Sequence, residues 1–170
     1  MTTSSGSRAL ITDFDGTLVR LAVDWPALRR RLGVSAIADA VQRGDAESLV
    51  LIAAAERDGA VHGERIASAI HFVLRFPAFA VMTQNSESAV HAFFDQNAPL
   101  RQRCVAVLGR EQHGQRKQDV AVFAELVERC VPLLEASGTT EITYLGDQAY
   151  ELDAARSLGL RAVDVATRSR

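Results

Sequence analysis

The sequence is poor in lysine, in cysteine and in long apolar runs, and each shortage narrows the kinds of protein that it can encode. Its 19 lysines and arginines are set against 21 aspartates and glutamates, which gives a formal net charge of -2. Proteins that track the phosphates of nucleic acids need a basic surface, so we expect no nucleic-acid partner. The longest purely apolar run spans residues 49–55 and is far too short to cross a bilayer, so we expect no membrane partner.

The two cysteines, Cys104 and Cys130, are too few for a disulfide framework or a thiolate metal site. We therefore expect both to be small core residues in a reducing compartment. The first eight residues are polar and resemble a frayed tail more than a signal peptide, which favours a cytoplasmic protein. A chain of 170 residues that is 48% hydrophobic is typical of one globular domain with a modest insertion.

Five short apolar runs predict β-strands, and helical patterns separate the later ones. The predicted strands are residues 9–12, 79–82, 104–108, 142–145 and 162–165, and the predicted helices between them are residues 87–96, 119–129 and 150–158. We expect Pro132 to break or kink the second helix. Alternating strands and helices indicate an α/β fold, with a doubly wound five-stranded parallel sheet that helices cover on both faces.

The segment between the first and second predicted strands is far longer than one crossover helix requires. Its pattern predicts helices at residues 25–32, 46–57 and 64–74, with a short segment opening at Ser35; Asp24 and Asp45 are candidate N-caps and Gly33 a C-terminal stop. We therefore predict a core domain of residues 1–20 and 76–170 and a small helical cap of residues 21–75.

Two aspartates follow the first strand, at the edge of the sheet where open α/β folds bind ligands. Asp13 and Asp15 are two positions apart in the run DFDGT, and they would repel each other unless a cation lay between them. Gly16 then allows close approach of the backbone. An ordinary Asp-Gly turn with two solvated acids is the alternative explanation.

Polar residues follow two later strands at the same edge. Thr83 lies after the second strand and before a helix, where a hydroxyl and free helix amides suit a phosphate. Taken alone, this segment is better explained by simple helix capping. Asp147 and Glu151 follow the fourth strand, where acids suit a hard cation or merely the helix dipole.

The lysine shortage itself points to a site. Lys117 is the one lysine in a chain with 18 arginines, and it lies just before a predicted helix. A compact ammonium group differs from a wide planar guanidinium in a tight site, so we expect a specific role for Lys117, with a chance surface lysine as the alternative.

Together these motifs resemble those of the haloacid dehalogenase superfamily, in the branch whose phosphoglycolate-phosphatase-like and phosphoglucomutase-like members carry a helical cap. The resemblance runs from residue 9 to about residue 165, with the motifs DFDGTLV, Thr83 in MTQN, Lys117 in RKQD, and GDQAYELD. Asp15 and Asp147 favour phosphoryl transfer over carbon–halogen cleavage, which needs neither a leaving-group acid nor a magnesium site.

The resemblance implies a Mg²⁺-dependent hydrolase of a small phosphorylated metabolite. In it Asp13 attacks phosphorus and forms an aspartyl-phosphate, while Asp15 acts first as acid and then as base. The implied metal ligands are Asp13, Asp15 through its carbonyl oxygen, Asp147 and Glu151, and the implied phosphate contacts are Gly16, Thr83, Gln84 and Lys117. A phosphomutase and a non-catalytic phosphate-binding module remain alternatives, and we expect a monomer or a homodimer.

Overall fold

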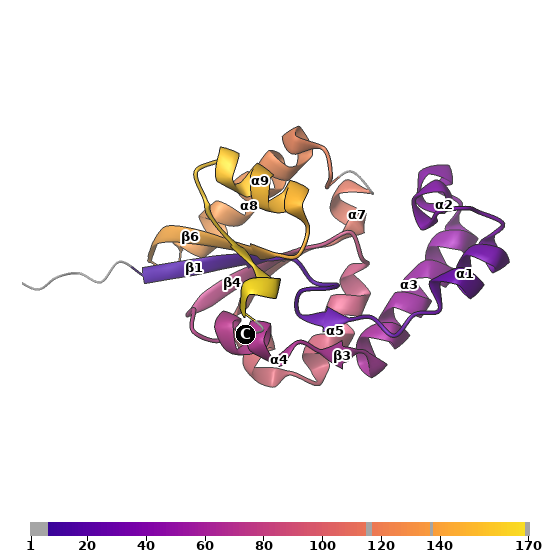
Figure 1. Ribbon diagram of the computed structural model, residues 1–170, viewed down its shortest axis with the longest axis horizontal. Helices are drawn as coiled ribbons and strands as arrows, with labels where there is room; N and C mark the ends of the chain where they lie inside the picture. The colour runs from indigo at the N-terminus through magenta and orange to yellow at the C-terminus, as the bar shows by residue number, and fades with distance from the viewer. Residues whose placement is uncertain (1–6, 115–116, 137, 169–170) are drawn as a thin grey trace, which may run out of the picture.

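The central sheet has five parallel strands, in agreement with the predicted fold class. The computed structural model describes residues 7–114, 117–136 and 138–168. The strands are β1 (Ser7–Thr12), β4 (Ala78–Met82), β5 (Cys104–Leu108), β6 (Thr139–Gly146) and β7 (Arg161–Asp164). Their order across the sheet is β5-β4-β1-β6-β7, so the first strand is central (Figure 1).

Helices cover both faces of this sheet. On one face lie α4 (Ala67–Val73) and α5 (Glu87–Asp95), and on the other lie α8 (Val120–Glu135) and α9 (Ala149–Ser157) (Figure 1). Successive residues of a strand point to opposite faces. Accordingly Leu10 of β1 belongs to the apolar cluster that includes α5, whereas Ala9 and Ile11 belong to the cluster that includes α8. Burial on both faces explains why these strands are continuously apolar.

Three helices of the long insertion form a separate group at one end of the sheet (Figure 1). They are α1 (Trp25–Leu32), α2 (Ile37–Arg43) and α3 (Ala46–His62). The predicted caps are present, because Asp24 accepts a hydrogen bond from the amide of Ala27 and Asp45 accepts one from the amide of Ser48. Leu28, Ala40 and Ile52 are the buried centre of a small apolar cluster between these helices.

The ends of the insertion differ from the prediction. Residues 64–65 are not helical; they form β3 (Glu64–Arg65), which pairs antiparallel with β2 (Val19–Arg20). The helix that follows is α4, which buries Ala69 and Val73 in the apolar cluster of the sheet although it falls within the residue range predicted for the cap. The domain boundaries therefore stay a prediction.

The helix break expected at Pro132 is absent, and the alternative, a kink, stays a prediction. Pro132 does not break α8, which continues to Glu135. Proline removes one helical hydrogen bond, and burial of Cys130 and Leu134 on either side of it stabilises the continued helix. The remaining elements are α6 (Ala98–Arg103), α7 (Arg110–His113) and a 3₁₀ turn at Val165–Arg168. Within the described residues no helix is long and apolar enough to span a membrane.

Candidate functional site

Most of the predicted site residues line one cavity at the carboxyl edge of the sheet, and Gly16 and Lys117 lie beside those that do. Asp13, Thr83 and Asp147 directly follow β1, β4 and β6, which are neighbours in the sheet. The cavity has a volume of about 440 Å³. Its lining includes Asp13, Asp15, Thr83, Gln84, Asp147 and Glu151 from the core and Trp25, Arg29 and Glu56 from the inserted helices. Parallel strand order thus brings together residues that lie far apart in the sequence.

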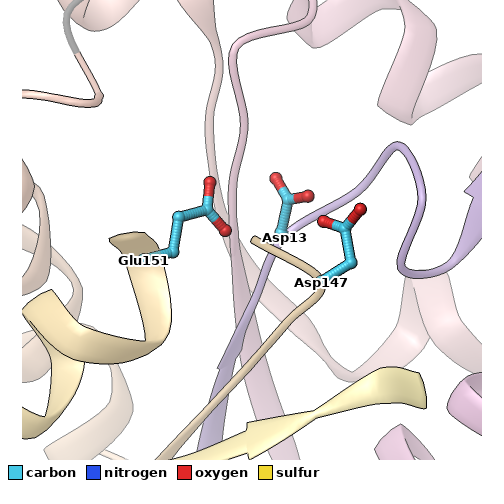
Figure 2. Close-up of side chains that lie close together, drawn as sticks. All are labelled: Asp13, Asp147 and Glu151. Atoms are coloured by element: carbon cyan, nitrogen blue, oxygen red, sulfur yellow. The ribbon is translucent and has the colours of Figure 1, made fainter. Parts of the chain in front are cut away.

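Three carboxylates in this cavity form a candidate metal site. Figure 2 shows the side chains of Asp13, Asp147 and Glu151 gathered at the strand ends, and one oxygen of each lies within 4.8 Å of the others. Asp147 Oδ1 is buried and has no hydrogen-bond partner among the described residues. A buried carboxylate oxygen without a partner is costly unless a cation binds it. The cluster therefore fits a divalent metal ion.

Gly16 keeps the space beside this cluster open. Its backbone has φ of +78°, a conformation that residues with a side chain rarely adopt. A Cβ atom at this position would also lie 2.5 Å from Asp147 Oδ2. Glycine is thus required here both by conformation and by contact with a candidate metal ligand, which explains its place in the DFDGT motif.

Lys117 lies at the centre of the site. Its side chain is fully buried, and Nζ lies 2.7 Å from Asp13 Oδ1, 2.7 Å from Glu151 Oε1 and 2.8 Å from the carbonyl oxygen of Met82. Burial lowers the pKa of Lys117, but the two carboxylates outweigh burial and raise the pKa above its usual value. The prediction of a specific place for this lysine agrees with its three contacts, which use all three ammonium hydrogens.

Asp13 and Asp15 have different surroundings. Burial, opposed by Lys117, raises the pKa of Asp13 to about 7. Burial also raises the pKa of Asp15, whose Oδ1 accepts a hydrogen bond of 3.0 Å from the amide of Leu21. The carboxylate of Asp15 lines the cavity but does not belong to the three-acid cluster. The prediction that the carbonyl oxygen of Asp15 binds the metal stays a prediction.

Glu151, which we predicted as a metal ligand, is already well supplied with donors. Oε2 accepts a 2.7 Å hydrogen bond from the hydroxyl of Tyr144, and Oε1 accepts one of 3.0 Å from the hydroxyl of Tyr150, besides its contact with Lys117. These donors orient the carboxylate towards the lysine. These three donors leave about one of the four acceptor sites of the carboxylate for a direct bond to a metal.

The loop after β4 differs from the predicted phosphate cradle in one respect. The backbone amides of Asn85, Ser86 and Glu87 already donate hydrogen bonds, to Thr83 Oγ1, Glu56 Oε2 and Glu111 Oε2 respectively. The expectation of free amides at the start of α5 is therefore wrong for these three. Thr83 is buried beside the cavity, and its hydroxyl donates to Asn85 Oδ1 over 2.9 Å.

Several residues that surround the site were not predicted from the sequence. Glu56 and Arg110 form a buried ion pair beside the cavity, and His113 Nε2 lies 2.8 Å from the carbonyl oxygen of Thr83. Burial lowers the pKa of His113. No local motif marks these residues, because their partners are distant in the sequence.

Solved structures share this fold at low sequence identity. The UTR4 protein of Saccharomyces cerevisiae is 18% identical, with coverage of 94% of this chain and 89% of that one and a TM-score of 0.54. A HAD family enzyme from Bacteroides thetaiotaomicron, solved as a magnesium complex, is 13% identical, with coverage of 94% and 93% and a TM-score of 0.56. A HAD-superfamily hydrolase of subfamily IA from Geobacter sulfurreducens is 16% identical, with coverage of 96% and 90% and a TM-score of 0.53.

The chain therefore has the fold of the haloacid dehalogenase superfamily, as the motifs predict. No family model and no curated protein sequence matches it. Since one fold can host many reactions, the activity has to be argued from the site itself.

Proposed function

We propose that the protein is a divalent-metal-dependent hydrolase of small phosphomonoesters, with Mg²⁺ as the metal and Asp13 as the nucleophile. The observation that carries this proposal is the pairing of Asp13 with Lys117 beside the three-acid cluster. One oxygen of Asp13 contacts the ammonium group of the lysine. Its carboxylate also faces a cavity of about 440 Å³, which is large enough for a small metabolite.

Asp13 and Asp147 would hold the metal, with Glu151 oriented next to them. When bound, Mg²⁺ reduces the repulsion between a phosphate dianion and the attacking carboxylate. The orphaned Oδ1 of Asp147 supports this assignment, because it is a buried oxygen in need of a cation. In the proposed reaction Asp13 forms a bond to phosphorus as the bond to the leaving oxygen breaks, and water then hydrolyses the aspartyl-phosphate.

Asp15 is the proposed general acid and base. Burial raises its pKa, so a larger fraction of this carboxyl group carries a proton near neutral pH than is usual for an aspartate. The protonated group donates to the leaving alkoxide, and the resulting carboxylate then removes a proton from water. The hydrogen bond from the Leu21 amide leaves one oxygen of Asp15 in the cavity for this task.

Thr83, Gln84, Lys117 and Gly16 are the proposed contacts of the transferred phosphoryl group. Lys117 supplies positive charge from its place beside Asp13, and Gly16 leaves space for close approach. The Thr83 hydroxyl would donate to the phosphoryl group in exchange for its bond to Asn85. Trp25 and Arg29 of the insertion line the opposite part of the cavity, where the rest of the substrate would lie. The insertion would thereby help to exclude water and select the leaving group.

Hydrolysis of a panel of phosphorylated metabolites and of 4-nitrophenyl phosphate, with and without Mg²⁺, tests this proposal. We expect metal-dependent phosphate release that Asp13→Asn abolishes, because an amide is not a nucleophile at phosphorus. Retained turnover in this variant would show that Asp13 is not the nucleophile. Reaction in ¹⁸O-labelled water separates hydrolysis, which labels the released phosphate, from a mutase reaction, which isomerises a sugar phosphate without labelling.

A further inference from the structure

A buried ion pair joins the insertion to the start of α7, next to the loop after β4. Glu56 lies on α3 and is 2% exposed, and Arg110 begins α7 and is 6% exposed. Arg110 Nη1 lies 2.7 Å from Glu56 Oε1 and Nη2 lies 2.9 Å from Oε2, so the contact is bidentate. We infer that Glu56 is a positioning residue that fixes the 83–86 loop for binding of the transferred phosphoryl group, an inference that rests on the proposed function.

This pair holds three consecutive residues of the loop. Arg110 Nη1 donates to the carbonyl oxygen of Gln84 over 3.1 Å. Asn85 Nδ2 donates to Glu56 Oε1 over 3.3 Å, and the amide of Ser86 donates to Glu56 Oε2 over 2.9 Å. The pair thus sets both the backbone path of the loop and the direction of one of its side chains.

The contact with Asn85 extends to the proposed phosphate ligand. The hydroxyl of Thr83 donates to Asn85 Oδ1, while the amide of Asn85 donates back to Thr83 Oγ1. Glu56 fixes which way the Asn85 side chain faces, because only its NH₂ group can donate to a carboxylate. Asn85 in turn sets the position of the Thr83 oxygen at the cavity. Glu56 of the insertion therefore determines, through Asn85, the position of Thr83 at the end of β4.

The hydrogen-bonding capacity of Glu56 excludes a direct part in the chemistry. Its two oxygens accept from four donors, which come from Arg110, Asn85 and Ser86, and a carboxylate has about four acceptor sites. No acceptor site on Glu56 remains to accept a proton during catalysis or to bind a metal ion. A buried ion pair adds little net stability compared with apolar residues of similar volume, so what this pair contributes is a defined geometry.

The test compares one single and one double variant. Glu56→Gln leaves Arg110 buried without its charge partner, which we expect to lower the thermal midpoint. The double variant Glu56→Leu with Arg110→Met removes both charges, and we expect it to recover part of the lost thermal midpoint. The recovery is partial because the Ser86 amide and Asn85 Nδ2 still lack their acceptor. Affinity for inorganic phosphate in the presence of Mg²⁺, measured by calorimetry, should stay about tenfold or more below that of the wild type in both. For 4-nitrophenyl phosphate, KM should rise by a larger factor than kcat falls.

The matched control is Asp58→Asn, which removes a carboxylate from an exposed position of the same helix. It should bind phosphate like the wild type. The inference is overturned if phosphate affinity recovers together with the thermal midpoint in the double variant, or if that variant does not fold, because either result assigns the pair to stability alone. A wild type that neither hydrolyses phosphomonoesters nor binds phosphate overturns the proposed function and this inference with it.

Discussion

The ammonium group of Lys117 lies 2.7 Å from Asp13 Oδ1, although 104 positions separate the two residues in the sequence. This contact joins the first and third motifs of the chain at the point where the sheet ends. The lysine does not contact the second oxygen of Asp13, Oδ2, which accepts a long hydrogen bond of 3.5 Å from Thr17 Oγ1. The lysine thus restrains the proposed nucleophile without covering both of its oxygens.

Replacement of this lysine by arginine should strongly reduce turnover. In Lys117→Arg the planar guanidinium cannot occupy a fully buried pocket shaped for three short contacts, so the charge moves away from Asp13. We expect kcat/KM for 4-nitrophenyl phosphate to fall by about 10² or more. The opposite exchange at an exposed position, Arg101→Lys, is the control and should leave kcat/KM unchanged. Near-wild-type kinetics for Lys117→Arg would show that the compact ammonium group is not needed.

Gly16→Ala should weaken metal binding. The new Cβ would lie 2.5 Å from Asp147 Oδ2, in addition to the strain of a positive φ. Gly44→Ala is a matched control, because Gly44 has a φ of +68° but no atom within 4 Å of a Cβ. Both variants should lose about 1 kcal/mol or more of unfolding free energy. Only Gly16→Ala should lower the affinity for Mg²⁺ in calorimetry, and equal affinities would separate Gly16 from the metal site.

The two tyrosines that bind Glu151 should differ in their contribution to stability. Tyr144 is fully buried, whereas Tyr150 is 38% exposed. Tyr144→Phe leaves a buried carboxylate oxygen without a donor and should cost about 1–3 kcal/mol of unfolding free energy in urea denaturation. Tyr150→Phe should cost less, because water can replace its hydroxyl. Equal losses would mean that water also reaches the Tyr144 side of Glu151.

His113 should make the protein less stable in mild acid. Burial lowers its pKa below the ordinary value of 6.5 in the folded state, so below that pH the unfolded chain binds more protons than the folded chain. The stability that depends on a neutral His113 is fully present above pH 6.5, and it is lost as the pH falls below that value. Because other groups also titrate in this pH range, a variant of His113 is needed to separate its contribution from theirs.

We expect the thermal midpoint of His113→Gln to fall less than that of the wild type between about pH 7.5 and pH 5.5. Glutamine can still donate to the carbonyl oxygen of Thr83. His91→Gln, at an exposed position, should follow the wild-type curve. Parallel curves for His113→Gln and the wild type would contradict the assignment.

The parts of the site that depend on strand order could be predicted from the sequence. Asp13, Thr83 and Asp147 each follow an apolar run directly, and the alternation of strands and helices places such positions at one edge. Lys117 was predicted from its rarity. The Glu56–Arg110 pair could not be predicted, because its two residues are 54 positions apart and neither lies in a motif. The occupied amides of α5 were missed for the same reason, since their acceptors come from other elements.

The short β2–β3 ribbon has a consequence for how such a chain can vary. Val19 pairs with Arg65, and Arg20 pairs with Glu64, so the intervening helices leave and re-enter the core at adjacent points. Closing a loop costs free energy that grows only slowly with its length. Modules of very different size could therefore be exchanged at this junction during evolution, or by grafting, without a change in the arrangement of residues at the carboxyl edge of the sheet.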